Sequence, residues 1–192
     1  MTHDRYDDSY IRGILNTVKT IAMVGASAKD NRPSYFAFKY LGERGYTMIP
    51  INPGLAGKEL LGRKIYARLS EVPEPIDMVD VFRASNYALP VVQEALTLNP
   101  KPRVIWMQLG VRNDEAAALA QANGMKVVMD RCPKIEYGRL SSEIGWIGVN
   151  SRTLSSKRAQ IFGKGVQRMS LNHATLGGGV AARVVREDEK SG

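Results

Sequence analysis

The sequence is poor in the residues on which many secreted proteins and metalloenzymes depend. It has one cysteine, Cys132, and two histidines among 192 residues, so no disulfide can form within the chain. A lone cysteine is typical of proteins in a reducing compartment. No apolar run approaches the roughly 20 residues that a membrane helix requires. The acidic first residues, MTHDRYDDSYIRGIL, fit neither a signal peptide nor a transit peptide. We therefore expect a cytoplasmic protein without membrane contact.

The chain also lacks the short motifs of common catalysts. The HExxH, GxSxG and P-loop signatures are absent, and the spacing of metal ligands is not seen either. The histidines, His3 and His173, lie near opposite ends of the sequence. Asp77 and Asp80 belong to a predicted strand and the residue before it, a position that needs no catalytic explanation. The sequence therefore predicts neither catalytic residues nor a metal site.

The charge of the chain is basic and unevenly distributed. The net charge is +8, of which residues 1–150 contribute +3 and residues 151–192 contribute +5. Such a surplus suits nucleic acid, an acidic partner protein, or a ligand with several phosphates. Phe162 is the only aromatic residue in the basic tail, so the tail offers no platform on which bases would stack. Nucleic acid is therefore the less expected partner.

Five apolar segments alternate with segments of helical spacing, and they span residues 20–25, 47–51, 78–82, 104–108 and 126–129. Continuous apolar runs are typical of strands buried on both faces. The alternation predicts right-handed crossovers and a parallel sheet. The expected fold class is α/β, a Rossmann-like doubly wound sheet of five parallel strands with an N-terminal helix at 8–18. We expect the strand order 3-2-1-4-5, with the ligand at the order reversal between strands one and four.

The domain is expected to cover residues 1–140, and an irregular, partly disordered C-terminal extension should cover 141–192. The extension begins with a small apolar cluster of Ile144, Trp146, Ile147 and Val149. Too little sequence follows to form a second core, so this cluster must pack on the domain or on another copy. Because symmetric dimers are the commonest assembly, we expect a homodimer with Trp146 as an anchor. Docking within a monomer is the alternative.

The turn after the first predicted strand is suited to phosphate. The turn and the helix start comprise Gly25, Ala26, Ser27, Asn31, Arg32, Pro33 and Ser34. Glycine lets backbone approach a phosphate, a helix start presents N–H groups such as those of Ser34 and Tyr35, and Arg32 adds positive charge. The turn lacks the three glycines of an NAD fingerprint. Asn52 and Pro53 end the second strand, where an NAD site usually has an acidic residue. The pattern favours a nucleotide other than NAD.

Five motifs, in order, carry a resemblance to a known family: GASAKDNRPSY, INPGLAGKELLGRKIY, DMVDVFR, VIWMQLGV and VVMDRC. Together they resemble the stand-alone coenzyme A-binding proteins, whose domain is similar to the N-terminal domain of the succinyl-CoA synthetase alpha subunit. The likeness spans about residues 20–136. It implies a coenzyme A (CoA) or short acyl-CoA ligand, with Lys58 on the phosphates, and Phe82 with Arg83 beside the adenine or pantetheine. Arg63 and Lys64 are the alternative candidates for this phosphate contact.

Three more residues lie at the expected ligand edge of the sheet. Gln108 follows the fourth strand and is expected to hydrogen-bond a pantetheine amide. Trp106 lies two residues before it and is also predicted to contact the ligand, although a tryptophan in a buried strand more often packs in the core. Cys132 follows the fifth strand, where it could exchange with the CoA thiol to form a mixed disulfide. The alternative for Cys132 is an unreactive, half-buried thiol.

Three functions remain open from the sequence. The first is a non-catalytic CoA-binding module, such as a sensor, carrier or partner subunit, because the chain lacks the phosphohistidine domain and the ATP-grasp part of the ligases that it resembles. The second is an NAD(P)-dependent enzyme on the same fold, in which Arg63 and Lys64 would read a 2′-phosphate. The third is a basic tail that binds nucleic acid or an acidic partner. The fold alone does not choose among them.

Overall fold

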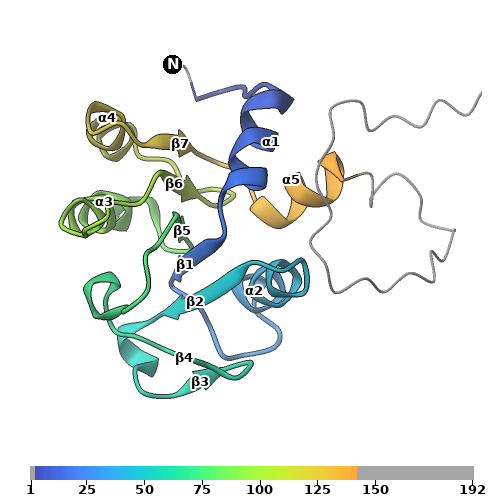
Figure 1. Cartoon of the computed structure of the whole chain (residues 1–192), viewed down its shortest axis with the longest axis vertical. Helices are drawn as coiled ribbons and strands as arrows, with labels where there is room; N and C mark the ends of the chain where they lie inside the picture. The colour runs from blue at the N-terminus through green and yellow to red at the C-terminus, as the bar shows by residue number, and fades with distance from the viewer. Residues whose placement is uncertain (1–2, 142–192) are drawn as a thin grey trace, which may run out of the picture.

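The computed structural model describes residues 3–141. These residues form an α/β fold, in which a β-sheet has helices on both faces (Figure 1). The sheet contains β1 (Thr20–Val24), β2 (Thr47–Ile51), β5 (Met78–Val81), β6 (Val104–Met107) and β7 (Lys126–Val128). The helices are α1 (Asp8–Thr17), α2 (Pro33–Glu43), α3 (Ala88–Leu96), α4 (Asp114–Ala122) and α5 (Pro133–Leu140). A short hairpin of β3 (Glu59–Leu60) and β4 (Arg63–Lys64) lies between β2 and β5, with 3-10 turns at Pro53–Leu55, Leu69–Glu71 and Ser85–Tyr87.

The five strands are all parallel, as predicted, but their order differs from the expected one. The order is β2-β1-β5-β6-β7, so the third main strand lies beside the first and not outside the second. The reason lies in Pro50, which has no N–H for a neighbouring strand and is confined to sheet edges. A loop segment covers this edge instead, because Tyr66 N–H donates to Pro50 O at 3.0 Å and Tyr66 O accepts from Asn52 N–H at 2.8 Å.

The corrected order moves the reversal of the sheet to the gap between β1 and β5. Ligands of open parallel sheets bind at such a reversal, outside the carboxyl ends of the strands. Here those ends are Val24 with Gly25 and Val81 with Phe82, and Phe82 N–H donates to Val24 O at 2.8 Å. The two chain segments that border the crevice are therefore hydrogen-bonded neighbours.

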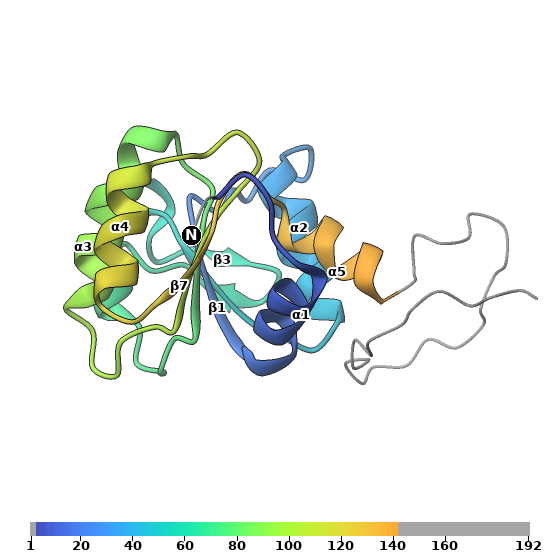
Figure 2. The ribbon, with the colours of Figure 1, turned by 90° about the horizontal axis from the view of Figure 1, so that it is seen from above.

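The core is divided by the sheet into two layers. Helices α1, α2 and α5 cover one face, and α3 and α4 cover the other (Figure 2). In α2 the buried side chains are Ser34, Ala37, Phe38 and Leu41, which recur at helical spacing and face the sheet. Every residue of β5 and β6 is buried, as the continuous apolar runs predicted.

The open edge at β7 is closed by tyrosine side chains from the N-terminal segment. Tyr6 Oη accepts from Met129 N–H at 2.7 Å, and Tyr10 Oη accepts from Val127 N–H at 3.1 Å. Tyr10 Oη also donates to Val127 O at 3.2 Å. Side-chain hydroxyls thus take the place that another strand would fill, which protects an edge from pairing with other chains.

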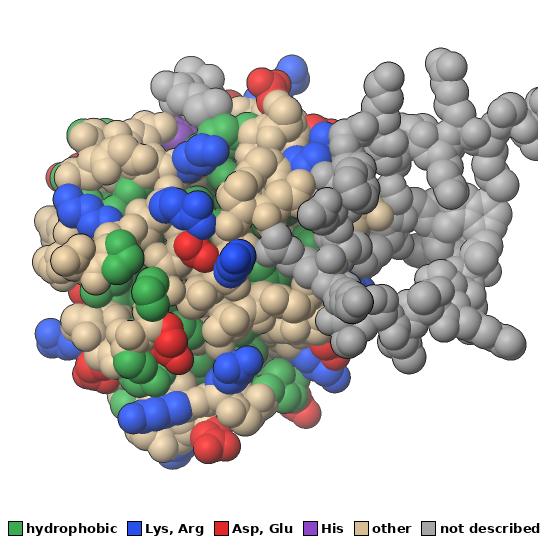
Figure 3. Space-filling view, in the orientation of Figure 1, with side chains coloured by type: hydrophobic (Ala, Val, Ile, Leu, Met, Phe, Trp, Pro, Cys, Tyr) green, Lys and Arg blue, Asp and Glu red, His purple; other side chains and the backbone are tan. Residues whose placement is uncertain are grey.

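Within residues 3–141, no helix has the length and apolar character needed to cross a bilayer. The same part of the chain holds no cluster of three or more His, Cys, Asp or Glu side chains that would bind a metal. On the face seen in Figure 3, basic side chains are interspersed with acidic ones. The predictions for the C-terminal extension and for the Trp146 dimer anchor fall outside the described residues.

Candidate functional site

A cavity of about 620 Å³ opens at the carboxyl edge of the sheet. Its lining comes from the loop before α2, from α2 itself, from the ends of β5 and β6, and from the start of α5. The lining residues are Asn31, Pro33, Phe36, Ala37, Phe82, Arg83, Gln108, Leu109, Val111, Cys132, Lys134 and Ile135. The volume falls within the roughly 300–1,000 Å³ usual for ligand pockets. Six of the twelve, namely Asn31, Pro33, Phe82, Arg83, Gln108 and Cys132, were predicted from the sequence.

Gly25 lies at the reversal point, where only a glycine fits. Its φ is +90°, and a β-carbon there would lie 2.5 Å from the carbonyl oxygen of Phe82. Gly25 N–H donates to Ile51 O at 2.8 Å. The residue therefore lets the β1 and β5 ends approach closely and keeps the backbone of the turn open toward the crevice.

The turn between β1 and α2 is organised by its own serines. Ser34 Oγ accepts from Ser27 N–H at 3.1 Å, and Ser27 Oγ accepts from Lys29 N–H at 3.2 Å. Arg32 is the extended N-cap residue and Pro33 starts the helix. The sequence predicts that the N–H groups of Ser34 and Tyr35 face a phosphate, but Tyr35 N–H donates to Arg32 O at 3.0 Å. The N–H of Ser34 remains in the first turn, where helices have no internal acceptor.

Asn52 has a positioning role at the end of β2. Its Nδ2 donates to Ala26 O at 2.7 Å, and its Oδ1 accepts from Gly54 N–H at 3.0 Å. The amide thus joins the β1–α2 turn to the 3-10 turn that begins at Pro53. Both ends of the Asn52 amide are engaged in these hydrogen bonds. Because Asn52 is an amide and not a carboxylate, the end of β2 lacks the acidic group with which dinucleotide-binding folds contact a ribose.

Lys58 lies beyond this turn, just before the β3–β4 hairpin, and its side chain is exposed. Its backbone is held in the loop, since Lys58 N–H donates to Leu55 O at 3.1 Å and Ile65 N–H donates to Lys58 O at 2.8 Å. Lys58 does not line the described cavity. Its predicted contact with phosphate therefore concerns a part of the ligand that lies outside the cavity.

The β5 end supplies an aromatic ring and a cation. Phe82 and Arg83 both line the cavity, and the Arg83 guanidinium carbon lies 5.3 Å from the centre of the Tyr87 ring. Such stacking fixes a guanidinium over an aromatic face. Both residues lie beside the reversal point, and their contact with a ligand stays a prediction.

Gln108 is held by a buried carboxyl group whose importance the sequence pattern did not indicate. Gln108 Nε2 lies 3.0 and 3.1 Å from the two carboxyl oxygens of Asp80. Asp80 is fully buried in the middle of β5, and this burial raises its pKa to about 8, with the hydrogen bond from Gln108 acting in the opposite direction. A carboxyl with this pKa is mostly protonated at neutral pH, and its oxygens accept from the Gln108 amide at the cavity wall.

Trp106 does not belong to the cavity, which corrects its assignment as a ligand contact. Its side chain is fully buried among the residues of the α1, α2 and α5 layer. The indole N–H donates to Arg131 O at 2.7 Å. Trp106 on β6 therefore fixes the segment after β7, and acts on the cavity only through that segment.

Cys132 is the N-cap residue of α5 and lines the cavity. Burial raises the pKa of its thiol above the ordinary value, and the nearby Ile135 and Lys134 N–H groups act in the opposite direction. A protonated thiol is a poor nucleophile. This environment favours the interpretation of Cys132 as an unreactive thiol.

The sequence did not predict the apolar rim of the cavity. Phe36, Leu109 and Ile135 are 50%, 57% and 45% exposed, respectively, and all three line the cavity. Large apolar side chains exposed around one concave site mark a binding surface. The sequence of α2 could have indicated this exposure, because Phe36 does not share the helix face of the buried residues Ala37, Phe38 and Leu41.

This geometry defines a Rossmann-like α/β domain with a cavity at the reversal point of its sheet. A family model described as "CoA binding domain" matches residues 19–138. The chain belongs to this CoA-binding domain family.

Similar proteins share most of the domain. YneT of Bacillus subtilis (strain 168) is 39% identical over 127 residues, which cover 66% of this chain and 91% of YneT. A hypothetical protein from Pyrococcus horikoshii OT3 has a solved structure with a TM-score of 0.67 and 36% identity, covering 73% of this chain and 99% of that one. The structure of ID.343 from Thermus thermophilus has a TM-score of 0.65 and 38% identity, covering 70% of this chain and 98% of that one.

A more distant relative is a ligase subunit. The alpha subunit of ADP-forming acetate–CoA ligase I from Pyrococcus furiosus is 32% identical over 80 residues, which cover 40% of this chain and 17% of that subunit. The relation to acyl-CoA synthetase alpha subunits that the motifs implied is thus confirmed. It concerns only a small part of the ligase subunit.

Proposed function

We propose that this protein binds CoA or a short acyl-CoA as a module without catalytic machinery of its own, serving as a sensor, carrier or partner subunit. The observation that carries the proposal is the pairing of the Gly25 turn with the apolar cavity beside it. The turn offers backbone and the α2 start to phosphates. The cavity, which is lined mainly by apolar side chains, can accommodate the uncharged pantetheine arm of CoA.

In this arrangement the diphosphate of CoA lies on the turn at residues 25–34, with Arg32 at the helix start. The 3′-phosphate end extends over the loop after β2, toward Lys58. The pantetheine arm enters the cavity, where Phe36 and Leu109 cover its apolar parts and Gln108 meets an amide. The thiol end then points to the start of α5, at Cys132.

A binding role is supported by the chemistry of the lining. Gln108 Nε2 donates to the Asp80 carboxyl, and this contact favours one orientation of the amide. Cys132 keeps its proton because burial raises its pKa. Neither group is arranged as a nucleophile with an adjacent base, the arrangement that covalent catalysis requires.

Thermal unfolding of the full chain with CoA, NAD and NADP tests the proposal. A ligand that binds only the folded state raises the unfolding temperature, and at 100 times its Kd it adds about 2.7 kcal/mol. We expect a rise with CoA and no rise with the dinucleotides. A rise with NAD or NADP and none with CoA would support the NAD(P) enzyme and refute a CoA module.

A further inference from the structure

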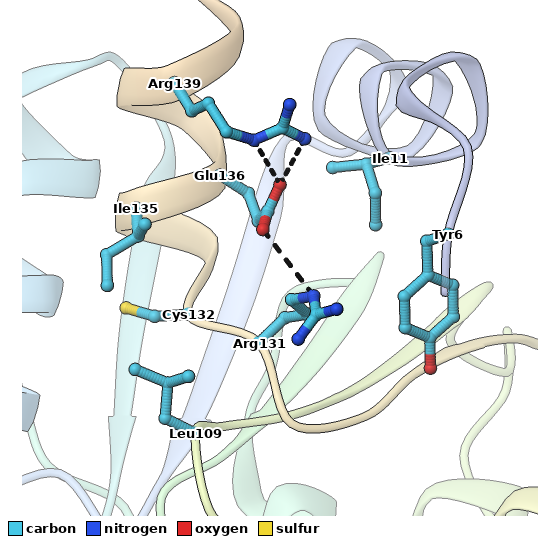
Figure 4. Close-up of a pocket in the computed structure, with 8 residues that line it drawn as sticks. All are labelled: Tyr6, Ile11, Leu109, Arg131, Cys132, Ile135, Glu136 and Arg139. Atoms are coloured by element: carbon cyan, nitrogen blue, oxygen red, sulfur yellow. Dashed lines mark hydrogen bonds and ion pairs between the residues drawn. The ribbon is translucent and has the colours of Figure 1, made fainter. Parts of the chain in front are cut away.

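A second cavity, of about 330 Å³, adjoins the first. The two share Leu109, Cys132 and Ile135 in their linings, so these residues form the boundary between them. Figure 4 shows the second cavity between this boundary and the N-terminal segment, with Arg131 lying between the boundary residues and Tyr6. A group attached to the ligand end that reaches Cys132 would therefore enter it.

On one wall of the second cavity, Arg139 forms ion pairs with Glu136 and Asp8. Glu136 is buried, with its side chain only 10% exposed, and its Oε2 accepts from Arg139 Nη2 at 2.7 Å and Nε at 3.2 Å. Arg139 Nη2 also lies 2.7 Å from Asp8 Oδ1. Arg139 is thus bound by two carboxylates, and these hydrogen bonds, from Asp8 first, raise its pKa further. The charge of Arg139 is therefore already balanced by two carboxylates.

Arg131 differs from Arg139 because its guanidinium is only weakly committed. Its Nε lies 3.8 Å from Glu136 Oε1, beyond hydrogen-bond distance, and its Nη1 donates to the backbone O of Asp130 at 2.9 Å. Its Nη2 has no acceptor within residues 3–141. The side chain is 35% exposed and lines the second cavity. It therefore offers a fork of N–H donors to a molecule in that cavity.

Arg131 has one neighbour at its backbone and another beside its guanidinium. Its backbone carbonyl accepts from the Trp106 indole at 2.7 Å. Its guanidinium carbon lies 6.0 Å from the centre of the Tyr6 ring, and the Tyr6 hydroxyl is itself held by Met129 N–H. A guanidinium fork recognises a planar carboxylate with two hydrogen bonds.

We propose that the second cavity takes the acyl group of an acyl-CoA, and that Arg131 binds a carboxylate at the far end of that acyl group. The inference rests on the proposed function, since it places the thioester at Cys132. The ligand class is then acyl-CoA derived from a dicarboxylic acid. A purely apolar acyl chain fits less well, because it would strip water from Arg131 and Glu136 without replacing their hydrogen bonds.

Titration calorimetry on the full chain, with thiols kept reduced, tests this inference. The probes are malonyl-, succinyl- and glutaryl-CoA, compared with acetoacetyl-CoA and butyryl-CoA. Acetoacetyl-CoA has nearly the shape of malonyl-CoA but carries a methyl ketone in place of the carboxylate. We expect at least one of the three ligands with an acidic acyl group to bind about tenfold more tightly, or better, than both ligands with a neutral acyl group.

Variants assign the preference to Arg131. Arg131→Gln should abolish the preference for the acidic ligand while leaving the affinity for free CoA within about twofold. Arg131→Lys should keep part of it, because it retains the charge and loses the fork. Lys101→Gln removes one exposed positive charge at the opposite, amino end of β6, and should leave the preference intact.

The outcomes separate the two proposals. If CoA binds and the acidic and neutral ligands bind alike, the acyl inference is wrong and the CoA module stands. The same conclusion follows if Arg131→Gln keeps the full preference, or if neutral ligands bind more tightly. If none of the CoA compounds binds the folded protein, both proposals fail together.

Discussion

The α-carbon of Gly25 lies so close to Phe82 that a side chain on it would meet the Phe82 carbonyl oxygen at 2.5 Å. The two residues follow β1 and β5, the strands on either side of the order reversal. Their approach brings the Gly25 turn, where we propose that the phosphates bind, next to the cavity. The close packing of these two strand ends is therefore a condition for the proposed site.

Gly25→Ala should lower the free energy of unfolding by more than the roughly 1–2 kcal/mol that left-handed backbone alone costs a residue with a β-carbon. The additional loss comes from the contact with Phe82. Gly57 is a matched control, because its φ is +83° and a β-carbon added to it would meet no atom within 4 Å. Urea denaturation measures both variants, and equal losses would show that the Phe82 contact is unimportant.

Asp80 should make the protein less stable as the pH rises. Its pKa is raised to about 8 in the folded protein, against about 3.9 when unfolded. The folded state therefore binds more protons between these values, and the contribution of Asp80 to stability is fully present below about pH 4 and is lost by about pH 8. Each unit of rising pH in this window lowers the free energy of unfolding by up to about 1.4 kcal/mol.

The variant Asp80→Asn isolates this effect, since it keeps the shape and cannot ionise. The difference in unfolding free energy between variant and parent should move in favour of the variant from pH 5 to pH 9. Urea titrations at several pH values measure it. A difference that stays constant with pH would mean that Asp80 is already ionised in the folded protein.

Tyr6→Phe should destabilise the fold by roughly 1–3 kcal/mol, because it leaves the Met129 N–H at the β7 edge without its acceptor. Tyr87→Phe is the control, since the Tyr87 ring is half exposed. Hydrogen exchange at Met129 should accelerate in the first variant only. Unchanged protection at Met129 would show that the tyrosine does not hold this edge.

Arg32→Ala and Lys58→Ala should each weaken CoA binding by about 10- to 100-fold without unfolding the protein, because charge-assisted hydrogen bonds contribute roughly 1.5–3 kcal/mol. Dephospho-CoA, which lacks the 3′-phosphate, separates their roles. If Lys58 binds that phosphate, Lys58→Ala should not weaken dephospho-CoA binding, whereas Arg32→Ala should. Unchanged CoA affinity in both variants would refute the phosphate assignment.

The fold class could be predicted from the sequence because the strands are continuous apolar runs separated by amphipathic helices. The ligand edge could be located too, since the carboxyl ends of parallel strands coincide. The predicted strand order was wrong because it ignored Pro50, although a proline within a strand is a readable signal of a sheet edge. Helix α5 was not predicted because its short, polar sequence has no clear period.

The errors at the site have a common physical origin. Trp106 and Gln108 are two residues apart and lie at the same edge, yet one is in the core and the other on the cavity wall. Only packing decides such a difference. The same holds for Asp80, whose burial and whose bond to Gln108 depend on neighbours that are distant in sequence. The roles of Tyr6 and Arg131 likewise arise from contacts across the whole fold.

Native mass spectrometry of the full chain, mixed with equimolar CoA and NAD, tests the central claim most directly. We expect a one-to-one complex whose added mass is that of CoA, with NAD left unbound. A complex with NAD in its place, or a folded protein that takes up neither nucleotide, would contradict the CoA-binding role.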